Sequence, residues 1–161
     1  MEGGIRVITV GDFMTRDLVT VREDDDLALA ESILRLGGIR HLPVVQEGRI
    51  TGLVTQRDLL RSAAQRSHKT TRASDIMVRE VVTVRPDTSL VQAAKIMLAN
   101  KFGCLPVAEE DGRLVGIITE SDFVRFAADM VQDLDMVAEA VSTGTRAWRN
   151  MTRKKAVPAI R

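Results

Sequence analysis

The sequence is poor in the residues that carry covalent, metal or aromatic chemistry. Its 161 residues include one cysteine, Cys104, two histidines, one tryptophan and no tyrosine. A single cysteine cannot form an intramolecular disulfide, so we expect a protein from a reducing compartment. Cys104 is interpreted as a small buried apolar residue, with a reactive thiol as the alternative.

Long apolar runs and a large charge imbalance are also absent. No stretch approaches the roughly 18 apolar residues that a membrane helix needs. Residues 1–12 lack the basic and apolar segments of a secretory signal. The net charge is only +1 while 45% of the residues are hydrophobic, which favours a globular fold over a disordered chain. We therefore expect a cytoplasmic protein.

The motifs of common enzyme classes are missing as well. There is no GxxxxGK[ST] phosphate-binding loop and no cluster of His, Cys and carboxylate residues at metal-ligand spacing. With only two histidines, no paired nucleophile and base stands out. The prediction is a protein that is not an enzyme and has no catalytic cofactor and no metal site.

An internal repeat is the strongest feature that is present. The run DFMTRDLVTVRED from Asp12 aligns with DIMVREVVTVRPD from Asp75, and HLPVV from His41 aligns with CLPVA. GLVTQRD from Gly52 aligns with GIITESD from Gly116. About twenty pairs are identical over about fifty aligned positions, which indicates a duplication. Two copies of this length predict a pseudo-twofold pair of units.

Both copies predict the same order of elements, which is strand, helix, strand, strand and helix. β-branched runs indicate the first strands, and apolar residues at helical spacing indicate the helices. Asp26 and Ser89 stand where N-caps belong, and Gly48 and Gly112 suit tight hairpin turns. The elements of the first copy are predicted at residues 18–21, 27–36, 42–45, 49–55 and 56–64. Those of the second are predicted at residues 81–84, 90–98, 105–108, 113–119 and 120–128.

The remaining segments predict a connector and a C-terminal extension. The polar stretch from Ser62, which includes His68, is interpreted as the connector. Met130, Leu134, Val137 and Val141 form one stripe of a helix that Gly144 ends. This stripe either continues the preceding helix onto the core or pairs with another chain. The last residues are basic and contain no acid, and a solvated tail is favoured over a nucleic-acid contact with Trp148 as its stacking aromatic. The basic residues of this tail are Arg146, Arg149, Arg153, Lys154, Lys155 and Arg161.

Each copy resembles a CBS domain, the module named after cystathionine beta-synthase, and the pair resembles a Bateman module. The motifs that carry the resemblance are DFMT and DIMV, the two VTV runs, IRHLPVV against FGCLPVA, and GLVTQRD against GIITESD. The resemblance covers residues 10–128. We divide the chain into a first CBS unit at residues 1–66, a second at 67–128, and a helix and basic tail at 129–161. The predicted fold class is α+β, with two βαββα units packed as a pseudo-twofold pair.

The resemblance implies a regulatory module that senses a ligand. Members of the family commonly bind AMP, ADP, ATP or S-adenosylmethionine in two clefts between the units, and many pair again into dimers. It therefore implies an adenosine-containing ligand, with or without Mg²⁺, a homodimer, and an unidentified regulated protein as partner. It implies no membrane partner, and nucleic acid is not favoured.

The ribose of such a ligand is best held by a carboxylate, because its oxygens can accept hydrogen bonds from both hydroxyls of the cis-diol. Asp58 and Asp122 are the matching residues. Thr55 and Thr119, three positions upstream, can reach the ribose or the first phosphate where each strand turns into a helix. The alternative is structural, since a threonine followed three residues later by an acid is a loose capping box.

Adenine requires an apolar slot. Its candidate walls are Val19, Val21 and Ile39 in one unit and Val82, Val84 and Phe102 in the other. Thr20 and Thr83 are favoured because the family uses that strand.

The positions expected to face phosphate differ between the units. Arg40, His41 and Arg57 in the first correspond to Gly103, Cys104 and Ser121 in the second, with Glu120 nearby. Arginines favour phosphates and a carboxylate opposes them. We therefore expect unequal clefts, and a phosphate-rich ligand in the cleft that receives Arg40 and Arg57.

Three other functions compete with a ligand sensor, and each makes a distinct prediction. A ligand-independent dimerisation or scaffold module predicts a melting temperature that ignores nucleotides. An enzyme predicts turnover of ATP that a single substitution abolishes. A nucleic-acid-binding tail predicts steep salt dependence that truncation after Gly144 removes.

Overall fold

A computed structural model describes residues 7–64 and 72–142 of the chain. Residues up to Glu120 form one compact unit that contains the first repeat and the second repeat as far as the start of its last helix, and residues from Ser121 form a second unit. His68, Gly144, Trp148 and the basic tail residues lie outside the described ranges. The elements of the first repeat are η1 (Val10–Asp12), α1 (Leu27–Leu36), β1 (His41–Gln46), β2 (Arg49–Thr55) and α2 (Gln56–Ala64). Those of the second are α3 (Ala73–Ile76), α4 (Leu90–Asn100), β3 (Cys104–Ala108), β4 (Leu114–Thr119) and α5 (Glu120–Ser142).

The predicted helix starts are confirmed by their caps. The Asp26 side chain accepts a hydrogen bond from the Ala28 N–H, and the Ser89 hydroxyl accepts one from the Gln92 N–H. Each cap therefore satisfies an N–H group that the first helical turn leaves without a partner. At the other end, α4 is followed by Lys101 in the left-handed conformation, with φ of 57°, a position that more often holds glycine.

Each repeat contains one antiparallel hairpin, as predicted. β1 pairs with β2 from His41 opposite Thr55, and β3 pairs with β4 from Cys104 opposite Thr119. The turns use Gly48 and Gly112, whose φ values of 77° and 83° favour a residue without a side chain. The fold is therefore α+β, with two two-stranded sheets.

The predicted strands at residues 18–21 and 81–84 are wrong. Only the last residue of each run pairs, Val21 with Val44 and Val84 with Val107, as single parallel bridges. Extending the first ladder back to Val19 would require an N–H from Pro43, and extending the second to Val82 would require one from Pro106. Proline has no such donor, so both runs stay outside the sheets.

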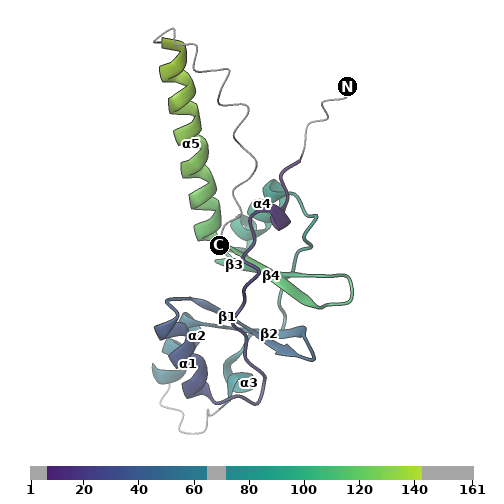
Figure 1. The fold of residues 1–161 in the computed structure, drawn as a ribbon. Helices are drawn as coiled ribbons and strands as arrows, with labels where there is room; N and C mark the ends of the chain where they lie inside the picture. The colour runs from purple at the N-terminus through teal and green to yellow at the C-terminus, as the bar shows by residue number, and fades with distance from the viewer. Residues whose placement is uncertain (1–6, 65–71, 143–161) are drawn as a thin grey trace. The chain divides into compact units, whose positions relative to one another are not determined.

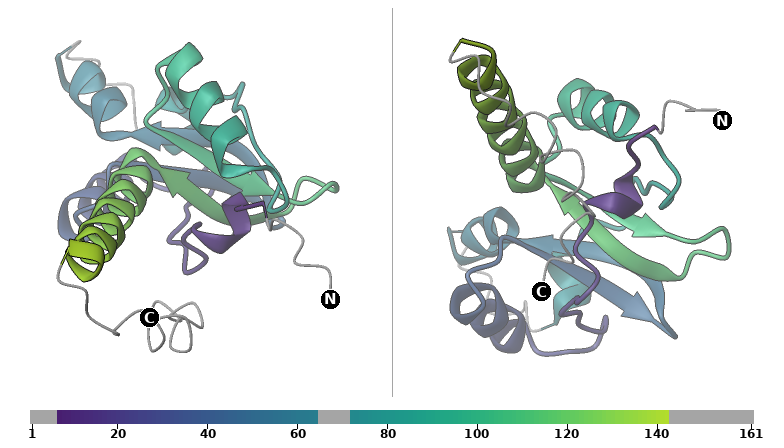
Figure 2. Two further views of the ribbon diagram at one scale, coloured as in Figure 1. Left: turned by 90° about the horizontal axis from the view of Figure 1, so that it is seen from above. Right: turned by 45° about the horizontal axis from the view of Figure 1, so that its top comes forward.

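The opening segment of each repeat packs on the sheet of the other repeat. Thr15 pairs with Ile117 of β4, and Val78 pairs with Leu53 of β2. The Met14 side chain lies over Gly116, where an added Cβ would be only 2.5 Å from its Sδ. Met77 lies over Gly52 with the same spacing. The two repeats thereby form one interlocked unit, whose two hairpins lie side by side (Figures 1 and 2).

The core of the first repeat joins its helix to its hairpin. Ala30 and Leu34 of α1 pack with Leu42, Val44 and Val54 of the hairpin. Ala73 and Met77, from the start of the second repeat, complete this buried cluster. Aliphatic side chains of this kind gain about 1.5–3 kcal/mol each on full burial, so the exchange of opening segments contributes to the stability of each repeat.

The helix predicted to end near residue 128 continues as α5 to Ser142. The separately considered stripe of Met130, Leu134, Val137 and Val141 therefore lies on the same helix, but it is not packed onto the core, and its pairing with another chain stays a prediction. Met130, Leu134 and Val141 are exposed, at 49%, 63% and 76%. No helix among the described residues is long and apolar enough to span a membrane.

Candidate ligand-binding cleft

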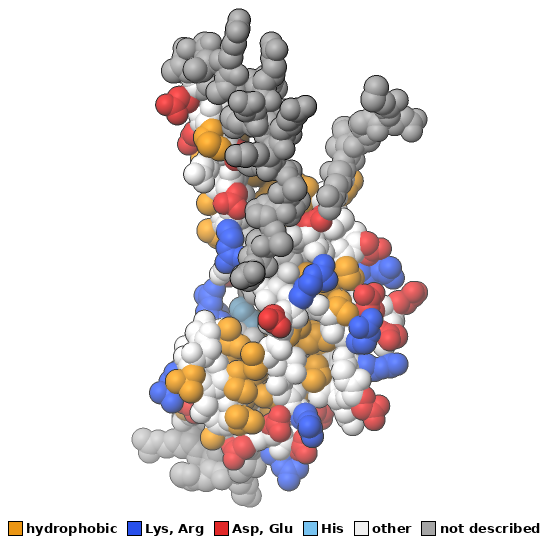
Figure 3. Space-filling model, in the orientation of Figure 1, with side chains coloured by type: hydrophobic (Ala, Val, Ile, Leu, Met, Phe, Trp, Pro, Cys, Tyr) orange, Lys and Arg blue, Asp and Glu red, His pale blue; other side chains and the backbone are white. Residues whose placement is uncertain are grey.

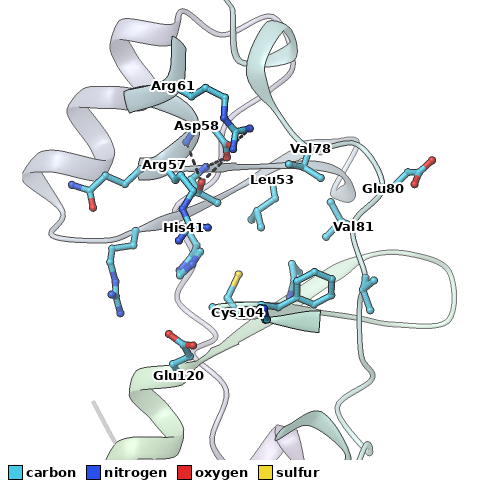
Figure 4. A pocket seen from close by; sticks show the side chains of 18 of the residues that line it. His41, Leu53, Arg57, Asp58, Arg61, Val78, Glu80, Val81, Cys104 and Glu120 are labelled. Atoms are coloured by element: carbon cyan, nitrogen blue, oxygen red, sulfur yellow. Dashed lines mark hydrogen bonds and ion pairs between the residues drawn. The ribbon is translucent and has the colours of Figure 1, made fainter. Parts of the chain in front are cut away.

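A cleft of about 530 Å³ lies between the two repeats, within the unit that ends at Glu120 (Figure 4). Its volume falls within the range of small-molecule sites. One wall comes from β1, β2 and α2 of the first repeat, and the other from residues 78–82 and 101–106 of the second. The surface of the cleft therefore depends on both repeats.

Seven of the thirteen predicted site residues line this cleft. They are Arg40, His41, Thr55, Arg57, Asp58, Phe102 and Gly103. The other six, Thr20, Ile39, Thr83, Thr119, Ser121 and Asp122, are not among its lining residues. Ile39 lines a groove between α1 and α2 instead. Thr20 and Thr83 lie in the runs that pair only at Val21 and Val84, and Thr83 is exposed.

Asp58 is held at the cleft by a complete capping box. Its Oδ2 accepts a 2.9 Å hydrogen bond from the Thr55 N–H and a 2.6 Å hydrogen bond from the Thr55 hydroxyl. The Asp58 N–H in turn donates to the Thr55 Oγ1 at 3.3 Å. The carboxylate is 9% exposed, and its Oδ1 lies 3.9 Å from the guanidinium of Arg61. The capping interpretation does not exclude binding, because both Thr55 hydrogen bonds are made to Oδ2 and neither is made to Oδ1.

An apolar wall lies to one side of Asp58. Leu53 and Val78 line the cleft near Asp58, and Val81 lies farther along the same side (Figure 4). Phe102 contributes an aromatic ring to the lining. This wall can receive a flat apolar group such as a purine base.

The predicted adenine slot is partly wrong. Val82 and Phe102 line the cleft, whereas Val21 and Val84 are buried in the hydrophobic core at 2% and 6% exposure. Their bridges to the sheets turn these two side chains inward. Val19 is 53% exposed and does not line the cleft.

A polar part of the cleft extends from Asp58 in a second direction, where His41 lies near Asp58 and Glu120 lies farther away (Figure 4). An added Cβ at Gly103 would lie 2.9 Å from His41 Nε2 and 3.8 Å from a carboxylate oxygen of Glu120. Gly103 therefore leaves the space that the His41 ring occupies, and the Glu120 carboxylate lies within ordinary contact distance of the same point. Burial and the neighbouring Arg40 lower the pKa of His41, while Glu120 opposes this shift. A neutral imidazole is therefore favoured at pH 7.

Cys104 also lines the cleft and is 5% exposed. Burial, with a smaller contribution from Glu120, raises the pKa of its thiol to about 12. A thiol of this kind stays protonated near neutral pH, which favours the interpretation of Cys104 as a buried apolar residue over a reactive nucleophile.

The equivalent residues of the second repeat are divided between the two compact units. Thr119 ends β4 in the first unit, whereas Ser121 and Asp122 begin the second. Asp122 repeats the arrangement of Asp58, since its side chain is 8% exposed and its Oδ1 lies 3.6 Å from Arg125. The position of Arg125 corresponds to Arg61, so the ion pair is duplicated together with the sequence.

Several lining residues were not predicted. They are Leu53, Gln56, Leu60, Arg61, Val78, Glu80, Val81, Lys101 and Pro106. Most are sequence neighbours of predicted residues, so extending each motif by one or two positions would have found them. Val78 and Leu53 are different, because they meet through a bridge between the repeats that no local pattern reveals. Among the residues that the structure describes, no group of three or more His, Cys, Asp or Glu could hold a metal ion.

Known proteins with the same arrangement are CBS-pair proteins. The protein CBSX2, in its complex with AMP, superposes with a TM-score of 0.72 and 32% identity, covering 76% of this chain and 98% of that one. The CBS domain pair of protein MJ0100, in complex with 5′-methylthioadenosine and S-adenosyl-L-methionine, also superposes with a TM-score of 0.72, at 27% identity, covering 78% and 99%.

The sequence relatives agree. The uncharacterized protein MJ1225 of Methanocaldococcus jannaschii is 35% identical over 131 residues, which is 74% of this chain and 47% of that protein. This chain thus spans about half the length of that curated relative. The family model for the CBS domain matches twice, at residues 10–65 and 73–129. The chain belongs to the CBS domain family and carries two CBS domains in tandem.

Proposed function

We propose that this protein binds an adenosine-containing ligand in the cleft around Asp58 and acts as a regulatory ligand sensor. The observation that carries the proposal is the pairing of a fixed carboxylate from one repeat with an apolar wall contributed largely by the other. This combination suits the ribose and the base of a nucleoside. The ligands in the two superposed CBS-pair structures, AMP, 5′-methylthioadenosine and S-adenosylmethionine, all contain adenosine.

In the proposed complex the ribose hydroxyls face Asp58 Oδ1, which the capping box leaves available. The base lies against the wall near Val78 and Val81. On a ribose ring the two hydroxyls are attached to C2′ and C3′, the base to C1′ and the 5′ carbon to C4′. The base and the 5′ carbon therefore lie on opposite sides of the pair of hydroxyls. The 5′ substituent is thus directed toward His41 and Glu120. A ligand bound in this way contacts both repeats, so it favours whichever relative arrangement of them closes the cleft.

Isothermal titration calorimetry with AMP, ATP, S-adenosylmethionine and NAD tests this proposal. We expect at least one of these ligands to bind with a Kd below about 1 mM, a free energy of about 4 kcal/mol or more. Binding should weaken in Asp58→Asn. If none of the four binds, the sensor function is rejected.

A ligand-independent scaffold is the second candidate, and the Asp58 capping box favours it. Both hydrogen bonds from Thr55 to Asp58 have a structural purpose without any ligand. A scaffold predicts that the melting temperature does not change with nucleotide. A ligand bound to the folded state at 100 times its Kd instead stabilises it by about 2.7 kcal/mol, which a thermal shift assay detects.

We also propose that the protein forms a homodimer through the groove between α1 and α2. Leu34, Ile39 and Leu59 line this groove together with Leu60, which is 67% exposed. Hydrophobic side chains gather on the visible face over the first repeat (Figure 3). A second copy can cover such a surface. A purely monomeric sedimentation profile at tens of micromolar protein would reject this interface.

Two further expectations remain part of the proposal. The protein acts by binding and not by catalysis, so purified chain should show no ATP turnover. The cleft that receives Arg40 and Arg57 is expected to accept phosphate. Glu120 lies in the same cleft. The balance between its negative charge and the positive charges of the arginines therefore affects which ligand the cleft prefers.

A further inference from the structure

The carboxylate of Glu120 places a negative charge in the cleft where the proposed ligand binds. Glu120 is the first residue of α5 and the last residue of the unit that contains the cleft. Its side chain lines the cleft, and its carboxylate approaches Gly103 on the side where His41 also lies (Figure 4). The corresponding residue of the first repeat is the uncharged Gln56. Position 120 is therefore one place where the duplicated halves differ in charge.

His41 and Cys104, the two residues whose pKa values Glu120 affects, do not neutralise its charge. The pKa of His41 is lowered by burial and by Arg40, so the imidazole is favoured in its neutral form at pH 7. Cys104 keeps its proton, because its pKa is raised to about 12. Arg40 and Arg57 line the same cleft and bring positive charge. The polar side therefore presents positive and negative groups to the same ligand substituent.

We infer that Glu120 is a specificity-determining residue that reads the charge of the 5′ substituent. This inference rests on the proposed adenosine site, in which the 5′ group points toward His41 and Glu120. The carboxylate lowers the affinity for a 5′-phosphate relative to an uncharged 5′ group, and it raises the affinity for a positively charged one such as a sulfonium. The arginines supply general attraction for phosphate, and Glu120 sets the preference among adenosine ligands.

The size of the effect follows from Coulomb's law with solvent screening. A pair of unit charges about 6 Å apart, in a half-open site with an effective dielectric constant of about 40, changes affinity by about tenfold. Glu120 is exposed, so salt screening reduces this value. We expect the ratio of the Kd for AMP to the Kd for 5′-methylthioadenosine to fall by about five- to tenfold when this charge is removed.

The test is calorimetry at pH 7.5 and low salt with AMP, 5′-methylthioadenosine and S-adenosylmethionine. These ligands share adenosine and differ in the charge at the 5′ position. Glu120→Gln should tighten AMP, weaken S-adenosylmethionine and leave 5′-methylthioadenosine within about twofold. The Glu120→Gln substitution introduces glutamine, which is the residue at the corresponding position of the first repeat, Gln56. Glu120→Lys should extend both changes in the same directions, and circular dichroism establishes that each variant is folded.

The charge-matched control is Glu110→Gln. Glu110 is highly exposed, at 92% for its side chain, and lies outside the cleft. The Glu110→Gln substitution removes the same charge and should leave the Kd values of all three ligands unchanged. The inference is overturned if Glu120→Gln leaves the AMP to 5′-methylthioadenosine ratio unchanged while the ligands still bind, or if Glu110→Gln changes it equally. If no ligand binds the unaltered chain, the proposed adenosine site fails, and the inference fails with it.

Discussion

Substitution of Asp58 separates the two roles that its carboxylate can have. Oδ2 accepts two hydrogen bonds from Thr55, and Oδ1 lies 3.9 Å from the guanidinium of Arg61. Asp58→Asn keeps a carbonyl oxygen that can accept from the Thr55 N–H, but it removes the negative charge. Asp58→Ala removes both. Thr55→Ala removes the hydroxyl of the cap and leaves the carboxylate in place.

The expected magnitudes differ between binding and folding. A hydrogen bond to a charged group contributes about 1.5–3 kcal/mol, so losing it at the ribose weakens binding by about 10- to 100-fold in both Asp58 variants. Loss of a helix cap costs about 1 kcal/mol, which lowers the Tm of a chain of this size by about 2–4 °C. That loss should be full in Asp58→Ala and partial in Asp58→Asn. Thr55→Ala should lower the Tm but weaken binding by less than about fivefold.

Calorimetry with the tightest ligand and thermal denaturation without ligand measure the two effects independently. The capping box and the binding site share one residue, so only the comparison among the three variants is informative. If Asp58→Asn binds the ligand as tightly as the unaltered chain, the assignment of the ribose to Asp58 is wrong. If Thr55→Ala weakens binding as much as Asp58→Ala does, the carboxylate acts mainly by shaping the helix start.

Three further predictions concern single residues. At pH 8 the folded chain should react with iodoacetamide about a thousandfold more slowly than the unfolded chain, because burial raises the pKa of the Cys104 thiol from 9.0 to about 12. Equal rates would contradict the buried position. His41 has a lowered pKa, so its contribution to stability is complete above its unfolded pKa near 6.5 and declines as the pH falls toward its folded pKa. Urea denaturation at pH 7.5 and 5.5 should therefore show a smaller acid loss in His41→Asn. Gly52→Ala should lower the free energy of unfolding by about 1–3 kcal/mol, because the new Cβ would lie 2.5 Å from the Sδ of Met77. An unchanged urea midpoint would refute that packing.

The local elements of this protein were predictable because their causes are local. Asp26 and Ser89 cap helices through hydrogen bonds to residues two and three positions away. Gly48 and Gly112 allow turns that depend on their own φ angles. Interactions that close over a few residues can be read from the order of the residues.

The strand errors and the missed site residues had non-local causes. The runs ending at Val21 and Val84 have the composition of strands, yet prolines in the partner strands deny them the next hydrogen bond. Leu53 and Val78 became neighbours through pairing between the two repeats. Such contacts depend on which segments pack against each other in the folded chain. The pattern of residues within one segment contains no information about that packing.

The sequence by itself determined the duplication, the capped helices, the hairpins and the candidate carboxylates at Asp58 and Asp122, since each depends on short-range chemistry or on the alignment of the two halves. Only the tertiary structure decided how the cleft is composed. The opening segment of each repeat packs on the sheet of the other, and this exchange brings Val78 and Val81 into the same cleft as Asp58. It also brings Glu120 and His41 to the same glycine. Packing between distant segments, and not the repeat pattern, produced a cleft with one apolar and one charged side.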